Sequence, residues 1–249
     1  MNTLLGIQLD GLSKKDILEK IEKYMKSPNG FFHIVSINPE NMVIAQTDKL
    51  FREIVRTAQI RILDGIGTVI AGQILNIEVG SRYPGADLMQ DMVKRASERR
   101  MTVMFIGGKG NLAERVANCY SQQYSEAKFY GTEGIKDIEN PQIEEEKKTF
   151  SIVADIKPRM IFVSFGSPYQ EKWIWKNRAL LQGVLVMGVG GAFEFVAGDV
   201  ARAPRVVRSI GLEWLYRLFA QPWRIQRQLR LPYFLYLVFK QKLGLYKLI

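Results

Sequence analysis

The sequence contains one cysteine, one histidine and no long apolar run. A single cysteine, Cys119, excludes an internal disulfide framework and suits a reducing compartment. The longest apolar stretch, residues 231–239, has nine residues, whereas a membrane-spanning helix needs about 20. The first residues carry no basic segment ahead of an apolar run, so they do not resemble a signal peptide. These absences predict a cytoplasmic protein that does not span a membrane.

The usual means of holding a metal ion are also missing. There is no Asp-x-Asp pair of the kind that binds a divalent cation on a sugar diphosphate, and there is no Cys/His cluster. The histidine, His33, lies in an apolar strand pattern, which favours a place in the core over a catalytic role. We therefore predict no metal and no cofactor. A bound diphosphate would then have to be neutralised by Arg, Lys or helix N-termini.

Acidic residues are nearly absent from the last fifty positions. Residues 200–249 hold ten Lys and Arg against one acid, Glu213, and so carry +9 of a net charge of +10. The same segment is rich in aromatic and apolar residues, a combination that fits an anionic membrane surface. A pI near 9.6 also fits nucleic-acid binding. We do not expect a nucleic-acid partner, because the bases are confined to this one apolar segment and no zinc-finger or RNP-type motif occurs.

The first 195 residues alternate short apolar runs with helical patterns. Helices are expected at about 38–58, 86–99, 111–124, 139–155 and 170–181, with Asn111 and Glu114 forming a capping box. Apolar strands separated by helices indicate an α/β fold with a mostly parallel sheet flanked by helices. We predict a catalytic core at 1–195 and a helical appendage at 196–249, with two or three short helices broken at prolines. The expected strands are Phe31–Ile37, Arg61–Leu63, Thr102–Ile106, Lys128–Tyr130, Met160–Ser164 and Val184–Met187.

Unusual residues follow four of these strands. In an open α/β sheet, ligands bind outside the carboxyl ends of the strands. Asp64, followed by glycines, is the sharpest candidate, because a carboxylate there can act as a general base on a hydroxyl. A turn or helix-capping Asp is the alternative, and both interpretations stay open. The four segments are 36–40, 64–67, 166–173 and 188–193.

Two glycine-rich turns and three arginines are further candidates. The turns at Gly107-Gly108 and at residues 188–191 could present backbone N–H groups to phosphate, or could be tight strand-to-helix turns. Arg217, Arg224 and Arg227 have i, i+7, i+10 spacing, which puts them on one helical face if the turn at Pro222 is accommodated. They would then meet a diphosphate, or else lipid headgroups.

Six motifs in order along the chain resemble those of one family. Together they resemble the WecG/TagA/CpsF glycosyltransferases of bacterial envelope polysaccharide synthesis, and the likeness covers nearly the whole chain. Any one motif is weak, but the ordered set is specific. The motifs are LDGIG at 63–67, RYPGADLM at 82–89, FIGG at 105–108, GSPYQEKWI at 166–174, GVGGAF at 188–193, and RAP at 202–204 followed by GLEWLYRL at 211–218.

The resemblance implies a Rossmann-like core and an inverting, metal-independent transfer from a UDP-sugar. The donor would be UDP-N-acetylmannosamine or its uronic acid, and the acceptor a polyprenyl-diphosphate-linked sugar at the inner face of the cell membrane, in envelope polysaccharide or teichoic acid synthesis. The appendage would dock on the membrane and complete the active site. UDP-glucose or UDP-galactose as donor, and a non-catalytic membrane-peripheral scaffold, are the alternatives. The sequence leaves the oligomeric state open, a homo-oligomer included.

The resemblance also implies roles for residues. Asp64 matches the general base and Gln170 a glutamine near the sugar site. Ser36 and Asn38 stand where relatives often have Thr-x-Asn, and we place both in the catalytic set. The three appendage arginines match residues thought to bind the diphosphate. The substrate-binding set implied by the motifs is Arg82, Gly85, Asp87, Gly107, Gly108, Gly188, Gly190, Gly191, Arg217, Arg224 and Arg227.

Overall fold

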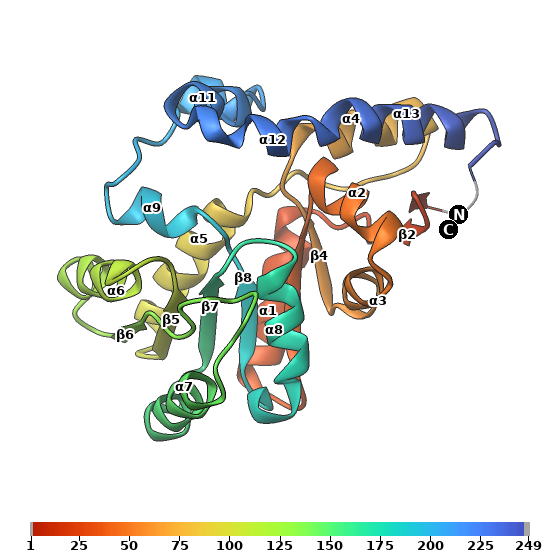
Figure 1. Cartoon of the computed structure of the whole chain (residues 1–249). Helices are drawn as coiled ribbons and strands as arrows, with labels where there is room; N and C mark the ends of the chain where they lie inside the picture. The colour runs from red at the N-terminus through yellow and green to blue at the C-terminus, as the bar shows by residue number, and fades with distance from the viewer. Residues whose placement is uncertain (1, 247–249) are drawn as a thin grey trace. The chain divides into compact units, whose positions relative to one another are not determined.

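The computed structural model describes residues 2–246, except for the side chain of Arg224. Lys247, one of the bases of the predicted appendage, lies outside the described residues. The chain forms two compact units, each built from separate stretches of sequence (Figure 1). The first unit comprises residues 1–19, 36–84 and 200–249, and the second comprises residues 20–35 and 85–199. The predicted division at residue 195 stays a prediction.

A six-stranded sheet confirms the predicted α/β class. Its strand order is β4-β3-β8-β7-β5-β6, and the pairings from β3 across to β6 are all parallel. Strand β3 belongs to both units, because residues 32–35 lie in the second and residues 36–37 in the first. The strands are β3 (Phe32–Ile37), β4 (Ile60–Leu63), β5 (Thr102–Gly107), β6 (Lys128–Thr132), β7 (Met160–Ser164) and β8 (Leu185–Gly188).

The second unit has an aromatic and aliphatic core around β5, β7 and β8. The Phe105 ring stacks on Phe162 with centroids 5.8 Å apart and meets Phe193 edge-on. His33 is buried in β3 beside Phe31, and burial lowers the pKa of its imidazole to about 3. The histidine is therefore neutral and part of the core, as predicted. The helices here are the end of α1 (Lys14–Lys26), α5 (Gly85–Glu98), α6 (Leu112–Gln123), α7 (Ile143–Ile156), α8 (Tyr169–Lys176), η1 (Arg178–Leu181) and α9 (Ala192–Val196).

In the first unit the C-terminal helices pack onto helices that follow β3 and β4. Helix α13 (Arg230–Lys242) lies against α2 (Pro39–Thr47) and α4 (Ile66–Leu75), and it buries Phe234 and Val238 completely (Figure 1). The Gln241 side chain accepts from the Leu5 N–H and donates to the Thr3 carbonyl, both at 2.7 Å. The remaining elements are β1 (Thr3–Leu4), β2 (Ile7–Gln8), α3 (Lys49–Thr57), α10 (Arg205–Ser209), α11 (Glu213–Ala220), η2 (Pro222–Arg224) and α12 (Ile225–Gln228).

Several predicted helix boundaries are wrong for identifiable reasons. The run 38–58 is two helices, because the Asp48 carboxylate accepts from the Phe51 N–H at 3.0 Å and starts a new helix. The run 170–181 is likewise divided into α8 and η1. Pro232 does not break the appendage, since it lies in the first turn of α13, where a missing N–H costs nothing.

Two further expectations about the helices differ from the structure. Asn111 precedes α6 without a side-chain capping bond, so the capping box is not formed. The appendage has four α-helices and one 3-10 helix within the described range, not two or three helices. Within residues 2–246, no helix is long and apolar enough to cross a membrane.

Candidate active site

The carboxyl ends of β3 and β4 lie side by side in the first unit. The Asp64 N–H donates to the Ile37 carbonyl at 3.0 Å, so Asn38 and Asp64 follow neighbouring strand ends. A Cβ at Gly67 would lie 2.6 Å from Pro39 Cγ. Glycine at position 67 therefore allows the loop after β4 to approach the start of α2, which brings the two predicted segments together.

Ser36 and Asn38 are held by helix-capping bonds. Asn38 is the N-cap of α2, and its Oδ1 accepts from the Asn41 N–H at 2.9 Å. The side-chain Nδ2 of Asn41 donates to the backbone carbonyl of Ser36 at 2.8 Å, and Ser36 is buried. These two predicted residues are thus fixed in position at the end of β3.

Asp64 is half-buried at the end of β4. The N-cap of α4 is Gly65, whose carbonyl accepts from the Thr68 hydroxyl at 2.7 Å. Asp64 therefore precedes the cap and is not itself the helix-capping residue, whereas the turn interpretation and the general-base role both stay open. Its carboxylate stands at the point where the α/β architecture places ligands.

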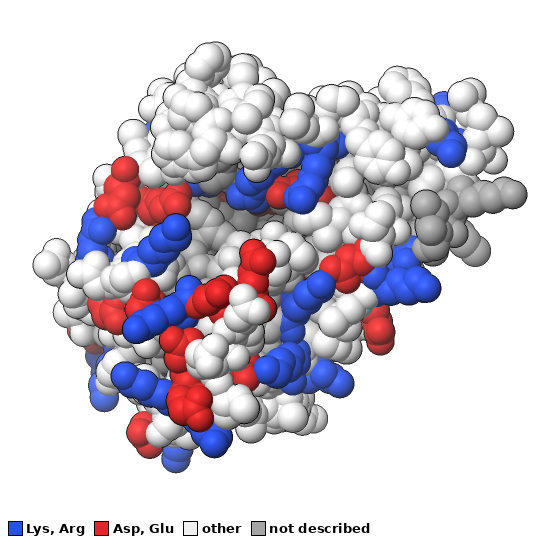
Figure 2. Space-filling model, in the orientation of Figure 1, with Lys and Arg blue, Asp and Glu red and all other residues white. Residues whose placement is uncertain are grey.

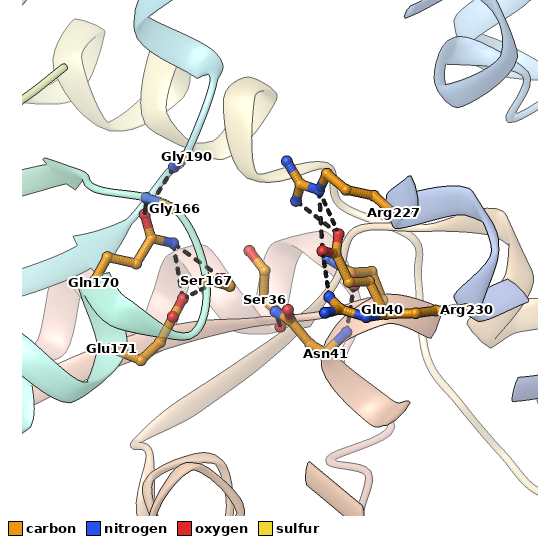
Figure 3. A network of polar contacts seen from close by, with 11 residues as sticks. Ser36, Glu40, Asn41, Gly166, Ser167, Gln170, Glu171, Gly190, Arg227 and Arg230 are labelled. Carbon is orange, nitrogen blue, oxygen red and sulfur yellow. Dashed lines mark hydrogen bonds and ion pairs between the residues drawn. The ribbon is translucent and has the colours of Figure 1, made fainter. Parts of the chain in front are cut away.

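Arg227 and Arg230 converge on the carboxylate of Glu40 in the same unit (Figure 3). Arg227 donates from Nε at 2.9 Å and from Nη2 at 2.6 Å to Glu40 Oε2, and Arg230 donates from Nη1 to Oε1 at 2.8 Å. Glu40 lies two residues after Asn38 in the first turn of α2. The structure therefore places Arg227 against the first turn of α2, which follows β3, and its role in binding the diphosphate stays a prediction.

Arg217, Arg224 and Arg227 do not share one helical face. They belong to α11, η2 and α12, because the backbone leaves the helix at Gln221 ahead of Pro222. Arg217 Nη2 donates to the Gln221 side chain at 3.2 Å. The predicted phosphate role of Arg224 falls on a side chain outside the described part of the structure.

Arg82 fastens the appendage to the rest of the first unit. Its backbone pairs with Leu63 at the end of β4, and its Nη2 donates to the Arg208 carbonyl at 2.7 Å. A Cβ on Gly211 would come within 3.0 Å of Arg82 Nη1. One contact of this predicted substrate residue is therefore structural, and its contact with substrate stays a prediction.

Gln170 is the centre of a buried network in the second unit (Figure 3). Its Oε1 accepts from the N–H groups of Gly166 and Gly190 at 3.2 and 3.1 Å. Its Nε2 donates to Glu171 Oε1 at 2.8 Å and to the Ser167 hydroxyl at 3.3 Å. Every one of these partners restrains the amide, so Gln170 is a rigid point between the loops after β7 and β8.

The glycine turns are tied into the same unit. Gly108 N–H donates to the Ser164 carbonyl at 2.8 Å, and the Ser164 hydroxyl donates to the Gly190 carbonyl at 2.7 Å. A Cβ at Gly188 would lie 2.5 Å from Gln170 Nε2, and one at Gly107 would lie 2.7 Å from the Ser164 carbonyl oxygen. The amides of Gly108 and Gly190 are therefore engaged within the protein, as tight strand-to-helix turns require.

The other predicted residues of this unit stand at helix starts. Gly191 is the N-cap of α9, Gly85 is the first residue of α5, and Asp87 lies in its first turn. Substrate binding by these residues stays a prediction. Within the described residues there is no group of three or more His, Cys, Asp or Glu side chains arranged to hold a metal ion.

Sequence reasoning gave no role to several residues that make polar contacts within each unit. Glu40 stood in the segment 36–40, and Ser167 and Glu171 stood in the motif at 166–174, but their partners were not visible from the sequence alone. Arg230 was counted only as one base of the appendage. The signal for Glu40 was an acid directly after Asn38-Pro39, where a carboxylate favours the first turn of a helix.

Comparison with known proteins finds similar chains over nearly the whole length. The model of the "Glycosyl transferase WecG/TagA/CpsF family" matches residues 2–248. The N-acetylglucosaminyldiphosphoundecaprenol N-acetyl-beta-D-mannosaminyltransferase of Staphylococcus aureus (strain NCTC 8325 / PS 47) is 32% identical over 241 residues, 96% of this chain and 92% of the relative. The protein of the same name from strain MRSA252 is 31% identical over the same shares. With the motifs in order over the whole length, the chain belongs to the WecG/TagA/CpsF family of glycosyltransferases.

Proposed function

We propose that this glycosyltransferase moves N-acetylmannosamine, or its uronic acid, from a UDP-sugar to a polyprenyl-diphosphate-linked sugar in envelope polysaccharide or teichoic acid synthesis. The names of the Staphylococcus aureus relatives support an N-acetylmannosaminyl donor and an N-acetylglucosaminyl-diphosphoundecaprenol acceptor. The same names specify a beta product, which a donor with an α-linked UDP gives only by inversion at the anomeric carbon.

One observation carries the proposal. Asp64 and Arg227 belong to the same compact unit, and each makes a hydrogen bond to residues 37–40, where β3 ends and α2 begins. Asp64 reaches this segment through the Ile37 carbonyl, and Arg227 through Glu40. A base and a cation at neighbouring strand ends are the two groups that sugar transfer from a nucleotide needs.

The proposed mechanism assigns each group a step. Asp64 takes the proton from the acceptor hydroxyl, whose oxygen attacks the anomeric carbon as the bond to the UDP oxygen breaks. Negative charge grows on the leaving diphosphate, and Arg217, Arg224 and Arg227 stabilise it without a metal ion. Gln170, fixed by the N–H groups of Gly166 and Gly190, would orient the sugar.

The appendage supports a membrane-bound site of action. Twelve of the eighteen exposed large apolar side chains of the described residues lie between positions 206 and 245. Phe219 is 78% exposed and Trp223 is 71% exposed, and Figure 2 shows an almost uncharged surface over α11. Contiguous exposed apolar surface together with Lys and Arg fits the interface of an anionic bilayer. We therefore place the enzyme at the inner face of the cell membrane, where its acceptor is anchored.

Product analysis with a panel of donors tests this function. The protein is incubated with a short-chain lipid-linked N-acetylglucosamine and with the UDP derivatives of N-acetylmannosamine, its uronic acid, glucose and galactose, and products are weighed by mass spectrometry. We expect transfer from one of the first two donors only. Asp64→Asn should slow transfer by about 10²–10⁴-fold while UDP still binds. Transfer from glucose or galactose alone would replace the proposed donor, and full activity of Asp64→Asn would remove its role.

A further inference from the structure

The carboxylate of Glu40 is a shared acceptor for two arginines of the appendage. Its side chain is 16% exposed, whereas those of Arg227 and Arg230 are 40% and 43% exposed. Both oxygens accept, because Arg227 donates to Oε1 and Oε2 and Arg230 donates to Oε1 (Figure 3). Charge-assisted bonds of this kind are short and directional, so they hold the guanidinium planes in fixed orientations.

The position of Glu40 is set by the backbone of α2 and does not depend on the arginines. Asn38 caps α2 and Pro39 occupies its first position, so Glu40 stands in the first turn of a well-started helix. An acidic side chain in the first turn of a helix lies close to the unpaired backbone N–H groups of that turn. Arg227 belongs to α12 and Arg230 is the first residue of α13, and both side chains reach the same carboxylate across the junction at Leu229. The next residue, Leu231, would lie 3.8 Å from a Cβ on Gly67, beside the Asp64 loop.

Two guanidinium groups face one carboxylate, so a positive charge remains at this place after the ion pairs have formed. The bonds from Arg227 to Glu40 use Nε and Nη2. A guanidinium has a second edge, formed by Nη1 and Nη2, that matches two oxygens of a phosphate group. In Figure 3 the outer end of Arg227 points away from the carboxylate.

We infer that Glu40 is a positioning residue, which orients the outer edge of Arg227 toward a phosphate oxygen of the nucleotide-sugar donor. The inference rests on the proposed function. Glu40 does not touch the substrate in this account. It removes the rotational freedom that an arginine on a surface helix would otherwise lose only when the donor binds.

A double-mutant cycle on the full-length chain tests the inference. Glu40→Gln keeps the shape of the side chain and removes its charge. We expect it to lower kcat/KM about tenfold and to raise the Kd of UDP about threefold, because Arg227 is no longer held. In an Arg227→Ala background the same change should cost less than about twofold, since Glu40 acts through Arg227. Glu40→Asp, which keeps the charge, should recover part of the loss.

Asp10→Asn is the matched control, because Asp10 pairs with Arg61 in the same unit and is similarly buried. It should lower thermal stability about as much as Glu40→Gln but leave kcat/KM within about twofold. An equal loss from Glu40→Gln in both backgrounds, no loss in the wild-type background, or an equal loss from Asp10→Asn would overturn the inference. Tighter UDP binding by Glu40→Gln would also overturn it, by showing that Glu40 competes with phosphate.

The readouts separate this inference from the proposed function. If the wild-type chain binds UDP but transfers none of the tested sugars, the proposed transfer fails, while the cycle on UDP affinity still decides the role of Glu40. If UDP does not bind to the wild-type chain, both fail.

Discussion

His33 should make the stability of the chain fall as the pH is lowered below 6.5. It is the only histidine, it is buried in β3, and burial lowers its pKa from the ordinary value of 6.5 to about 3. The unfolded chain therefore takes up a proton near pH 6.5, whereas the folded chain does so only near pH 3. Stability is complete above pH 6.5 and is lost progressively as the pH falls through that value toward 3.

The size of the loss follows from the pKa of the unfolded state. At pH 5.5 an unfolded histidine is about ten-elevenths protonated, which stabilises the unfolded chain by about 1.4 kcal/mol. At pH 7.5 the same effect is below about 0.1 kcal/mol. His33 should thus contribute a loss of about 1.4 kcal/mol between these two pH values. The loss does not depend on how far below 5.5 the folded pKa lies.

Urea unfolding at pH 7.5 and 5.5 measures this loss. His33→Leu removes the titrating imidazole and places an apolar side chain next to Val186 of β8. Contributions of the carboxylates are common to both proteins and cancel in the difference. The NMR signal of the single imidazole is a second measurement, and it should not shift between pH 8 and 5. A titration midpoint near 6.5, or an equal pH-dependent loss in His33→Leu, would refute the reasoning.

Three further outcomes follow from individual contacts. Gly188→Ala would push a methyl group against Gln170 Nε2, so we expect about 1–3 kcal/mol of destabilisation and reduced transfer; an unchanged Tm would contradict the contact. Trp223→Ser should weaken the sedimentation of the protein with anionic vesicles. Ile143→Ser is the control, because Ile143 of α7 is 63% exposed but lies outside the appendage, and it should leave sedimentation unchanged. Equal effects of the two substitutions would count against membrane docking. Gln241→Ala should cost about 1–3 kcal/mol in urea unfolding, because two backbone groups of the β1–β2 hairpin lose their partner; no change would show that water replaces it.

The strands could be predicted because their chemistry is local. Residues 103–106 and 160–163 are apolar throughout, a pattern typical of a buried parallel strand. Helix α4 was missed for the opposite reason. Its sequence, IGTVIAGQIL, is mostly apolar and contains two glycines, so it lacks the alternation of apolar and polar faces that marks a surface helix. In the structure α13 packs against α4, which explains why the helix is so apolar. The helix could not be predicted locally, because its pattern depends on a tertiary contact.

The site was predictable where it follows strand ends and was not where it depends on distant partners. Asp64 and Asn38 stand next to breaks in the apolar pattern, and the structure keeps them together. The partner of Glu40 lies 187 residues further along the chain, and no local pattern connects them. The bond from Arg82 to the Arg208 carbonyl spans 126 residues and could not be predicted from its motif.

The interleaved composition of the first unit has a consequence for biosynthesis. Residues 36–84 leave the ribosome well before α13, the helix that covers α2 and α4. Until α13 has been synthesised, the nascent chain exposes the apolar faces of α2 and α4, and Glu40 has no ion pair with Arg227 or Arg230. Contacts of such long sequence separation form slowly. A chain terminated before α13 would leave these apolar faces uncovered and would lack the ion pairs of Glu40, so it would be prone to aggregate.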